Sequence, residues 1–178
     1  MSAFRVTIIG AESTGKTTLS RQLADALGGD WVCEFARPYL EVTDGNVTLA
    51  SMDAIWHGQL ALQHSAHTSS RPYVVCDTDL FATVGYWQLP HVTDALGPCP
   101  DTLVRDALHD VADLYLVTQS NIPFEQDPLR YGGTIRESLD TYWTALCERF
   151  HLPYVVIASS EPDARLDEAL TIIKERST

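Results

Sequence analysis

Residues 10–17, Gly-Ala-Glu-Ser-Thr-Gly-Lys-Thr, have the spacing of a phosphate-binding loop, G-x-x-x-x-G-K-T. The two glycines let the backbone bend around phosphate oxygens and point successive N–H groups at them. Lys16 reaches the β- and γ-phosphates, and the Thr17 hydroxyl is a ligand for Mg²⁺. We therefore expect ATP and Mg²⁺ to bind here. The residues expected to contact the nucleotide in this segment are Gly10, Ala11, Glu12, Ser13, Thr14, Gly15, Lys16, Thr17 and Thr18.

The elements predicted on either side support this interpretation. Residues 4–9 form a short β-rich run directly before the loop, and residues 18–27 carry leucines at four-residue spacing before Gly28 and Gly29. Strand, loop and helix in this order is the context that the motif requires. An ordinary glycine turn in an α/β protein is the alternative, and the order of the elements disfavours it.

Composition limits the classes of function. The chain has 178 residues, 24 acidic and 12 basic, for a net charge of −12. Its length suits one domain, and we expect a single P-loop domain over residues 1–178. The acidic balance argues against nucleic acid, whose binding needs many Lys and Arg contacts to phosphates. No apolar run approaches the ~20 residues that span a bilayer, and no signal-peptide pattern opens the chain, so we expect a cytoplasmic protein.

The cysteines and histidines predict no site. The four cysteines are scattered without a C-x-x-C pair, so buried thiols are expected rather than disulfides. The six histidines show no metal-binding pattern. The chemistry of the chain is therefore expected elsewhere.

Apolar runs and helical patterns alternate along the chain. Further strands are expected at residues 30–33, 72–77, 112–117 and 154–157, and helices at 49–67, 80–88, 101–111, 134–150 and from 160 onward. Residues 41–47 and 90–100 are predicted loops, and Pro38 should prevent a helix from starting before it. The pattern predicts an α/β fold of the P-loop NTPase class, with a five-stranded parallel sheet and helices on both faces, similar to nucleoside monophosphate kinases. Ligands bind beyond the carboxyl ends of such strands, with the adenine expected near residues 159–165.

Two carboxylates end predicted strands, where such a sheet binds its ligands. Asp77 is expected to be a second Mg²⁺ anchor beside Thr17. The alternative is that Asp77 only caps the next helix, although Thr78 would cap it equally well. Glu34 follows the second strand, where small kinases bind the acceptor, and we expect it to take the proton of an acceptor hydroxyl. The roles of Glu34 and Asp77 can also be exchanged.

Residues 122–133 hold two prolines, a glycine pair and little periodicity, which predicts a lid loop. A closing lid excludes water and so protects ATP from hydrolysis. Arg130 is expected to contact the nucleotide and to neutralise charge on the transferred phosphoryl group, whereas Arg136 alone indicates little. No Asn-Lys-x-Asp guanine-binding element occurs, which disfavours a GTPase. The catalytic residues predicted for a small-molecule kinase are Lys16, Glu34, Asp77 and Arg130.

These residues resemble the ribosylnicotinamide kinase domain of NadR-type NAD-biosynthesis proteins. The resembling segments follow the order of the family and span roughly residues 4 to 160. They are residues 10–19 (GAESTGKTTL), 34–37 (EFAR), 55–59 (IWHGQ), 77–79 (DTD) and 127–130 (DPLR). The phosphate-binding loop is generic, whereas its Gly-Ala-Glu-Ser opening together with Glu-x-x-Arg and Asp-Thr-Asp is fairly specific.

The resemblance implies ATP-dependent phosphorylation of the 5′-hydroxyl of nicotinamide riboside, which gives nicotinamide mononucleotide. It also implies carboxylate contacts to the ribose and aromatic stacking on the nicotinamide ring. A cationic pyridinium suits an aromatic face in an acidic site. For Trp56, plain packing is an equal alternative to stacking. The substrate-binding residues predicted on this basis are Glu34, Arg37, Trp56, Asp79, Tyr86 and Trp87, of which the three aromatic ones are the stacking candidates.

Two other functions stay open at this stage. One is a kinase for another nucleoside or a small alcohol on the same scaffold, and the other is a regulatory module that binds ATP without catalysis. The intact Thr17, Glu34 and Asp77 favour an enzyme, because a sensor needs no base. NadR-type proteins carry a nucleotidyltransferase domain, and some a DNA-binding domain, ahead of the kinase; we expect neither in this chain. The sequence does not predict the oligomeric state.

Overall fold

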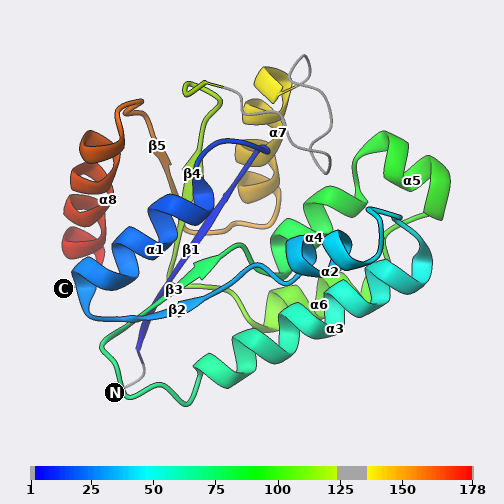
Figure 1. The fold of residues 1–178 in the computed structure, drawn as a ribbon, viewed down its shortest axis with the longest axis horizontal. Coiled ribbons are helices and arrows are strands. Elements are labelled where there is room, and N and C mark those ends of the chain that lie inside the picture. The colour runs from blue at the N-terminus through cyan, green and yellow to red at the C-terminus, as the bar shows by residue number, and fades with distance from the viewer. Residues whose placement is uncertain (1–2, 124–135, 178) are drawn as a thin grey trace.

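One parallel sheet forms the centre of the molecule (Figure 1). The computed structural model describes residues 3–123 and 136–177. Within these ranges the strands, in the spatial order β2-β3-β1-β4-β5, are β1 (Phe4–Gly10), β2 (Asp30–Val32), β3 (Tyr73–Asp77), β4 (Leu114–Thr118) and β5 (Tyr154–Ile157). All neighbouring pairs are parallel, and in the central strand Val6 aligns with Val75 of β3 and Leu114 of β4.

Helices follow each strand and also fill the longer connections. The described residues form α1 (Lys16–Leu27), α2 (Ala36–Val42), α3 (Leu49–Ala66), α4 (Leu80–Trp87), α5 (Pro90–Leu96), α6 (Asp101–His109), α7 (Arg136–Arg149) and α8 (Pro162–Arg176). None of these described helices combines the length and the hydrophobicity needed to cross a membrane. The sheet, its direction and the helices on both faces confirm the predicted P-loop α/β fold.

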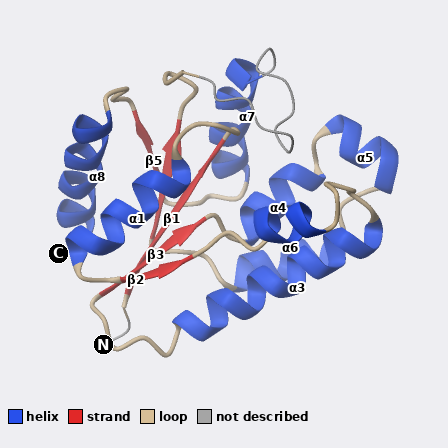
Figure 2. Ribbon diagram, viewed as in Figure 1, coloured by secondary structure: helices blue, strands red, loops and turns tan. Residues whose placement is uncertain are grey.

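The helices divide into two layers (Figure 2). On one face α1 and α8 pack against the sheet, and Leu23 and Ile173 meet Ile8 of β1 in a buried core. On the other face α3, α4, α6 and α7 form a larger core around Phe81 and Trp143. The strand β4 is buried along its whole length, as expected where helices cover both faces of a parallel sheet.

One segment predicted as a loop is helical, and another helix begins earlier than expected. The helix α2 begins at Ala36, two residues before Pro38, and α5 begins at Pro90. Proline is tolerated in the first turn because the N–H groups of that turn have no partner inside the helix. The predictions that Pro38 bars an earlier start and that residues 90–100 are a loop were therefore wrong. The two short helices matter because they form part of the wall of a cavity described below.

Candidate active site

The phosphate-binding loop leaves β1 at Gly10 and enters α1 at Lys16. Gly10 has φ 147° and Gly15 has φ 75°, values that favour glycine. A Cβ atom on Gly10 would also lie 2.5 Å from the carbonyl oxygen of Thr118 on β4. The first glycine is therefore required both by the turn and by the close approach of the neighbouring strand.

Side chains inside the loop hold its shape. The Thr14 hydroxyl donates to the carbonyl of Ala11 at 2.8 Å and lies 2.7 Å from the Thr118 hydroxyl. Lys16 Nζ donates to the carbonyl oxygens of Ala11 and Gly10, at 2.8 and 3.2 Å. The lysine thus bends back over the loop, next to the place where phosphate oxygens bind in this motif.

Arg165 supports the loop from α8. Its side chain is 4% exposed, and its guanidinium donates to the backbone carbonyl of Thr14 at 2.7 Å. Weaker contacts reach the carbonyl of Ser159 and the side-chain oxygen of Asn121, both at 3.4 Å. Burial lowers the pKa of Arg165 from its usual value. The sequence analysis placed residues 159–165 near the adenine but assigned no role to this arginine.

Thr17 and Asp77 lie together, as a Mg²⁺ site requires. A hydrogen bond from the Thr17 side chain lowers the pKa of Asp77, although burial outweighs it and the net shift is upward. The Asp77 Oδ1 atom is buried without a hydrogen-bond partner among the described residues. Hard oxygen ligands of this kind fit Mg²⁺, which usually binds one or two protein oxygens together with nucleotide phosphates. The described residues contain no cluster of three or more His, Cys, Asp or Glu side chains that could hold a metal ion.

A cavity of about 670 Å³ opens beside the loop. Its size lies within the range of small-molecule sites. Its lining includes residues 12–19 of the loop and α1, together with Arg165 and residues 160–162. The helices α2, α3, α4 and α5 and the residues that connect them also line it. Their side chains are both apolar, with Leu40, Val47, Met52, Ile55, Ala82, Leu89 and Val92, and polar, with Arg37, Gln59, Thr83 and His91 among them.

Glu34, which follows β2, also lines this cavity. Burial raises the pKa of its carboxyl group, and nearby Asp77 and Glu12 raise it further. Lys16 and Arg37 act in the opposite direction. Glu34 therefore lies close enough to Lys16 of the loop and to Asp77, the candidate Mg²⁺ ligand, for their charges to change its pKa. A base for an acceptor hydroxyl is needed at this place, beside the phosphates.

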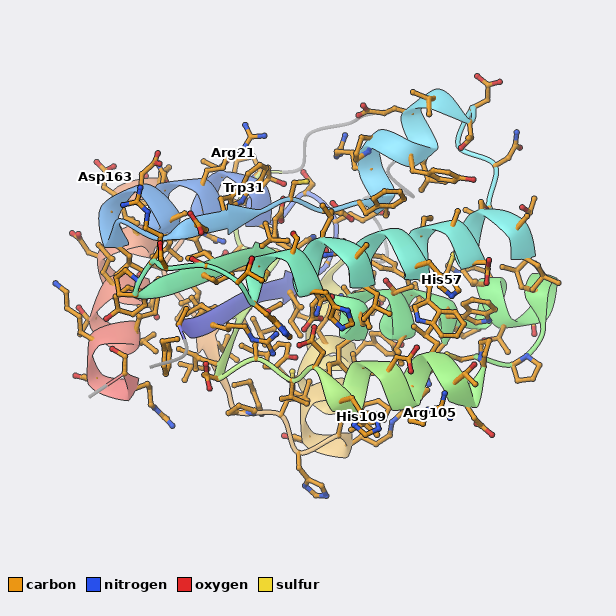
Figure 3. All side chains as sticks on the ribbon, turned by 90° about the horizontal axis from the view of Figure 1, so that it is seen from below. Arg21, Trp31, His57, Arg105, His109 and Asp163 are labelled. Atoms are coloured by element: carbon orange, nitrogen blue, oxygen red, sulfur yellow. The ribbon has the colours of Figure 1, made fainter. Side chains whose placement is uncertain are left out.

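The helix α3 positions the segment that carries Glu34. The Oε1 atom of Gln59 accepts a hydrogen bond from the backbone N–H of Phe35 at 2.9 Å. The Phe35 ring packs over Gly58, where a Cβ atom would lie 2.4 Å from the ring. The Gly-Gln pair of the IWHGQ segment is thus explained by packing and hydrogen bonding, a role that sequence reasoning did not assign. By contrast, His57 of the same segment is exposed on the outer side of α3 (Figure 3).

The three stacking candidates do not share one location. Tyr86 lines the cavity, and burial together with the carboxylates of Glu34 and Glu12 raises its pKa well above the usual value. Trp87 is 3% exposed, and its indole N–H donates to the carbonyl of Gly97 at 3.1 Å. Neither Trp87 nor the half-buried Trp56 belongs to the described lining of the cavity. Tyr86 is therefore the stacking candidate that the geometry retains.

Asp79 caps a helix. Its Oδ1 accepts hydrogen bonds from the backbone N–H groups of Phe81 and Ala82 at the start of α4, and its Oδ2 accepts one from the Tyr115 hydroxyl at 2.7 Å. The residue is 2% exposed and lies outside the described cavity lining. Because Thr78 has φ 68°, the backbone turns so that Asp79, rather than Asp77 or Thr78, reaches the cap position. The substrate contacts expected of Asp79 and Trp87 are therefore not supported.

Two predicted arginines have different outcomes. Arg37 lines the cavity from α2 and lies 3.4 Å from Glu41 one turn further along that helix. Arg130 and the start of the helix predicted at residues 134–150 lie outside the residues whose side chains are described. Of the predicted site, the structure therefore brings together the loop, Glu34, Arg37, Asp77 and Tyr86.

Residues 5–165 match the sequence profile of a family described as AAA domain. The chain belongs to the AAA domain family. No curated protein sequence matches this AAA-domain chain. The family explains the phosphate-binding loop and the strands around it, and it leaves the second substrate open.

Solved structures share the fold. The chain resembles NadR protein in complex with NAD and AMP-PNP, with a TM-score of 0.77 and 23% identity, and NadR protein in complex with NR, with 0.74 and 24%. These matches cover 98% of this chain but only 50% and 52% of the NadR chains, so the chain spans about half their length. Deoxyadenosine kinase from M. mycoides with bound dCTP matches with a TM-score of 0.65 and 13% sequence identity. This match covers 97% of this chain and 100% of the kinase chain. At such identities the likeness establishes the fold alone.

Proposed function

We propose that this chain is an ATP-dependent kinase that phosphorylates the 5′-hydroxyl of nicotinamide riboside to give nicotinamide mononucleotide. The observation that carries the proposal is the position of Glu34, a carboxyl group in the wall of a cavity that begins at the phosphate-binding loop. A nucleotide sensor needs neither a base nor space for a second substrate beside the nucleotide. A kinase needs a base and a site for its acceptor.

The residues of the chain divide the work between the two substrates. Backbone N–H groups of the loop and Lys16 hold the triphosphate, and Thr17 and Asp77 would hold Mg²⁺ with it. The bound ion neutralises charge that develops on the phosphates. Glu34 accepts the proton of the attacking hydroxyl as the bond between that oxygen and the γ-phosphorus forms and the bond from the γ-phosphorus to the β–γ bridging oxygen breaks, which releases ADP. The cavity walls orient that hydroxyl and exclude water, which would otherwise compete as acceptor.

The chemistry of the cavity supports a cationic, aromatic acceptor. Tyr86 offers an aromatic ring, and Glu12 and Glu34 place negative charge beside it. A pyridinium ring such as that of nicotinamide riboside is stabilised by both. The apolar side chains of Met52, Ile55 and Leu89 suit the uncharged part of such a ring. One of the similar NadR structures contains NR, which agrees with this choice of acceptor.

A coupled ADP-release assay with ATP and Mg²⁺ tests the proposal. The panel contains nicotinamide riboside, the natural ribonucleosides and deoxynucleosides, and a control without acceptor. We expect turnover with nicotinamide riboside to exceed that with every other acceptor, and the control to be near zero. Turnover with a deoxynucleoside instead would favour the activity of the similar deoxyadenosine kinase, and ATP binding without any turnover would favour a sensor; either result would overturn the proposal.

A further inference from the structure

Arg165 is a buried cation whose hydrogen bonds go to neutral oxygens. The side chain is 4% exposed, and its guanidinium donates to the backbone carbonyls of Thr14 and Ser159 and to the side-chain oxygen of Asn121. Among the described residues, no carboxylate forms an ion pair with it. Burying a charge without an opposite charge beside it is costly, so an arginine kept at this position calls for a functional reason.

The support from which Arg165 extends is held by hydrogen bonds of its own. Burial lowers the pKa of Arg165, and the charge of Glu168, further along α8, opposes this shift. Both carboxylate oxygens of Glu168 accept backbone N–H groups, from Ala158 at 3.1 Å and from Ser159 at 2.9 Å. Asn121 also donates to the carbonyl of Ala158, at 2.7 Å. The connection from β5 to α8 is therefore fixed, and Arg165 reaches from it to the phosphate-binding loop.

The shortest contact of Arg165 orients one peptide group of that loop. The guanidinium donates to the Thr14 carbonyl at 2.7 Å. The described chain has no cis peptide bond, and in a trans peptide the carbonyl and the next N–H point in opposite directions. The N–H of Gly15 therefore points away from the guanidinium. No described residue accepts a hydrogen bond from this N–H, which is one of the donors that bind phosphate oxygens in this motif.

Gly15 makes such a support necessary. Its φ is 75°, and glycine adopts several φ values at little cost, so the peptide group before it can rotate more easily than most. Arg165 and Gly15 both line the cavity, and a Cβ atom on Gly15 would lie 3.9 Å from the guanidinium. The hydrogen bond to Thr14 is thus close enough to hold the peptide in one orientation.

We propose that Arg165 is a positioning residue for the nucleotide, which holds the Thr14 carbonyl and so keeps the Gly15 N–H directed at the β-phosphate. Because the loop surrounds the β- and γ-phosphates, the contribution of Arg165 belongs to ADP and ATP and not to AMP. The inference rests on the nucleotide site of the proposed function and not on its acceptor. Nucleotide binding measured without any acceptor therefore tests it separately.

Calorimetry with ATP, ADP and AMP in the presence of Mg²⁺ tests the inference. The proteins are the wild type, Arg165→Met, Arg165→Lys and the control Arg105→Met. Methionine has neither charge nor donor, whereas lysine keeps the charge but has one ammonium group in place of the forked guanidinium. Arg105 is exposed on α6 and lies outside the described lining of the cavity, so its replacement makes the same change in net charge at a distance (Figure 3).

We expect Arg165→Met to bind ADP and ATP about 10- to 100-fold more weakly, the range of a lost hydrogen bond from a charged group, and AMP within about twofold of the wild type. In Arg165→Lys the ratio of ADP to AMP affinity should fall by about three- to tenfold, because one ammonium group cannot hold the oxygens of Thr14, Ser159 and Asn121 together. Arg105→Met should bind all three nucleotides as the wild type does. In the kinase assay, Arg165→Met should raise the KM for ATP and leave the KM for the acceptor within about twofold.

An equal loss of affinity for AMP, ADP and ATP in Arg165→Met would indicate an adenine contact or a general loosening of the site, and would overturn the inference. Unchanged ADP binding would overturn it as well. If a melting curve shows that Arg165→Met does not fold, Arg165→Lys decides, and a wild-type ratio of ADP to AMP affinity in that variant rejects the inference. The expected binding data together with no turnover of nicotinamide riboside would sustain the inference and refute only the proposed function.

Discussion

Glu34 holds its proton more tightly than a carboxyl group in water. Burial is the main cause, and the neighbouring carboxylates of Asp77 and Glu12 contribute, whereas Lys16 and Arg37 oppose them. A base accepts a proton only when it is ionised, so in the role we propose for Glu34 its raised pKa would determine where catalysis begins as the pH increases. The same acidic surroundings that raise this pKa also favour a cationic acceptor.

The pH dependence of turnover tests this assignment. We expect kcat/KM for the acceptor to be low at acidic pH and to rise through an inflection above the ordinary pKa of a glutamic acid side chain, as Glu34 loses its proton. The measurement is a pH–rate profile at saturating ATP. In Glu34→Gln the remaining activity should not show this inflection. An unchanged inflection in the variant would assign the titrating group to another residue.

At the scale of elements, α3 supports the segment that carries Glu34, the base that we propose. Gly58 accommodates the Phe35 ring and Gln59 bonds its backbone N–H, so the helix fixes the residue next to Glu34 in two ways. These contacts join segments far apart in the sequence. We infer that disturbing α3 at Gly58 impairs acceptor binding before it affects the nucleotide.

Gly58→Ala is the sharpest probe of this support. Alanine favours a helix over glycine by about 1 kcal/mol, but its Cβ would lie 2.4 Å from the Phe35 ring. We expect overpacking to dominate, with a net loss of about 1–3 kcal/mol in the free energy of unfolding. The acceptor KM should rise while the ATP KM changes little. Adding Phe35→Leu should restore stability in the double variant, and a Gly58→Ala protein as stable as the wild type would contradict the packing argument.

The capping residue Asp79 should leave a signature in stability. Burial raises its pKa from 3.8 to about 6, so the folded state binds this proton more tightly than the unfolded state does. The stabilisation that this proton provides is complete below about pH 4 and is lost as the pH rises towards 6.

Asp79→Asn should therefore alter the pH dependence of folding. Asparagine keeps an oxygen for the α4 cap but has no proton to lose. Between pH 5 and pH 7 we expect the free energy of unfolding of the variant to rise by about 1 kcal/mol relative to the wild type. Urea denaturation at several pH values measures this. A constant difference between the two proteins would mean that Asp79 is not the group that titrates.

Local patterns predicted most of these elements, and long-range contacts account for what they missed. The strand, loop and helix around Gly10 combine hydrophobic periodicity with a sequence motif, so the three elements and their function in phosphate binding were predicted together. The cap at Asp79 depends on the left-handed backbone of Thr78, which a sequence pattern does not reveal. Arg165 reaches Thr14 across 151 residues of sequence, and Gln59 is one of several polar residues on the buried side of α3. Neither gives a local signal of its role.

At the scale of the whole molecule, charges of both signs meet at one cavity of an acidic chain. The net charge is −12, and the cavity is lined by Lys16, Arg37 and Arg165 together with Glu12, Glu34 and Glu161. This arrangement suits a site that holds both an anionic nucleotide and a cationic acceptor. The parallel sheet makes it possible, because the loop follows β1 and Glu34 follows β2 at the same edge of the sheet, with β3 and its Asp77 between them.

The most direct test of this account compares ADP release by the wild type and by Glu34→Gln, with and without nicotinamide riboside, while calorimetry measures ATP binding to both. The account predicts that the wild type releases ADP only when nicotinamide riboside is present. It also predicts that Glu34→Gln binds ATP within about twofold of the wild type but turns over about 10²- to 10⁴-fold more slowly. Equal turnover by both proteins, or ADP release that does not depend on the acceptor, would contradict it.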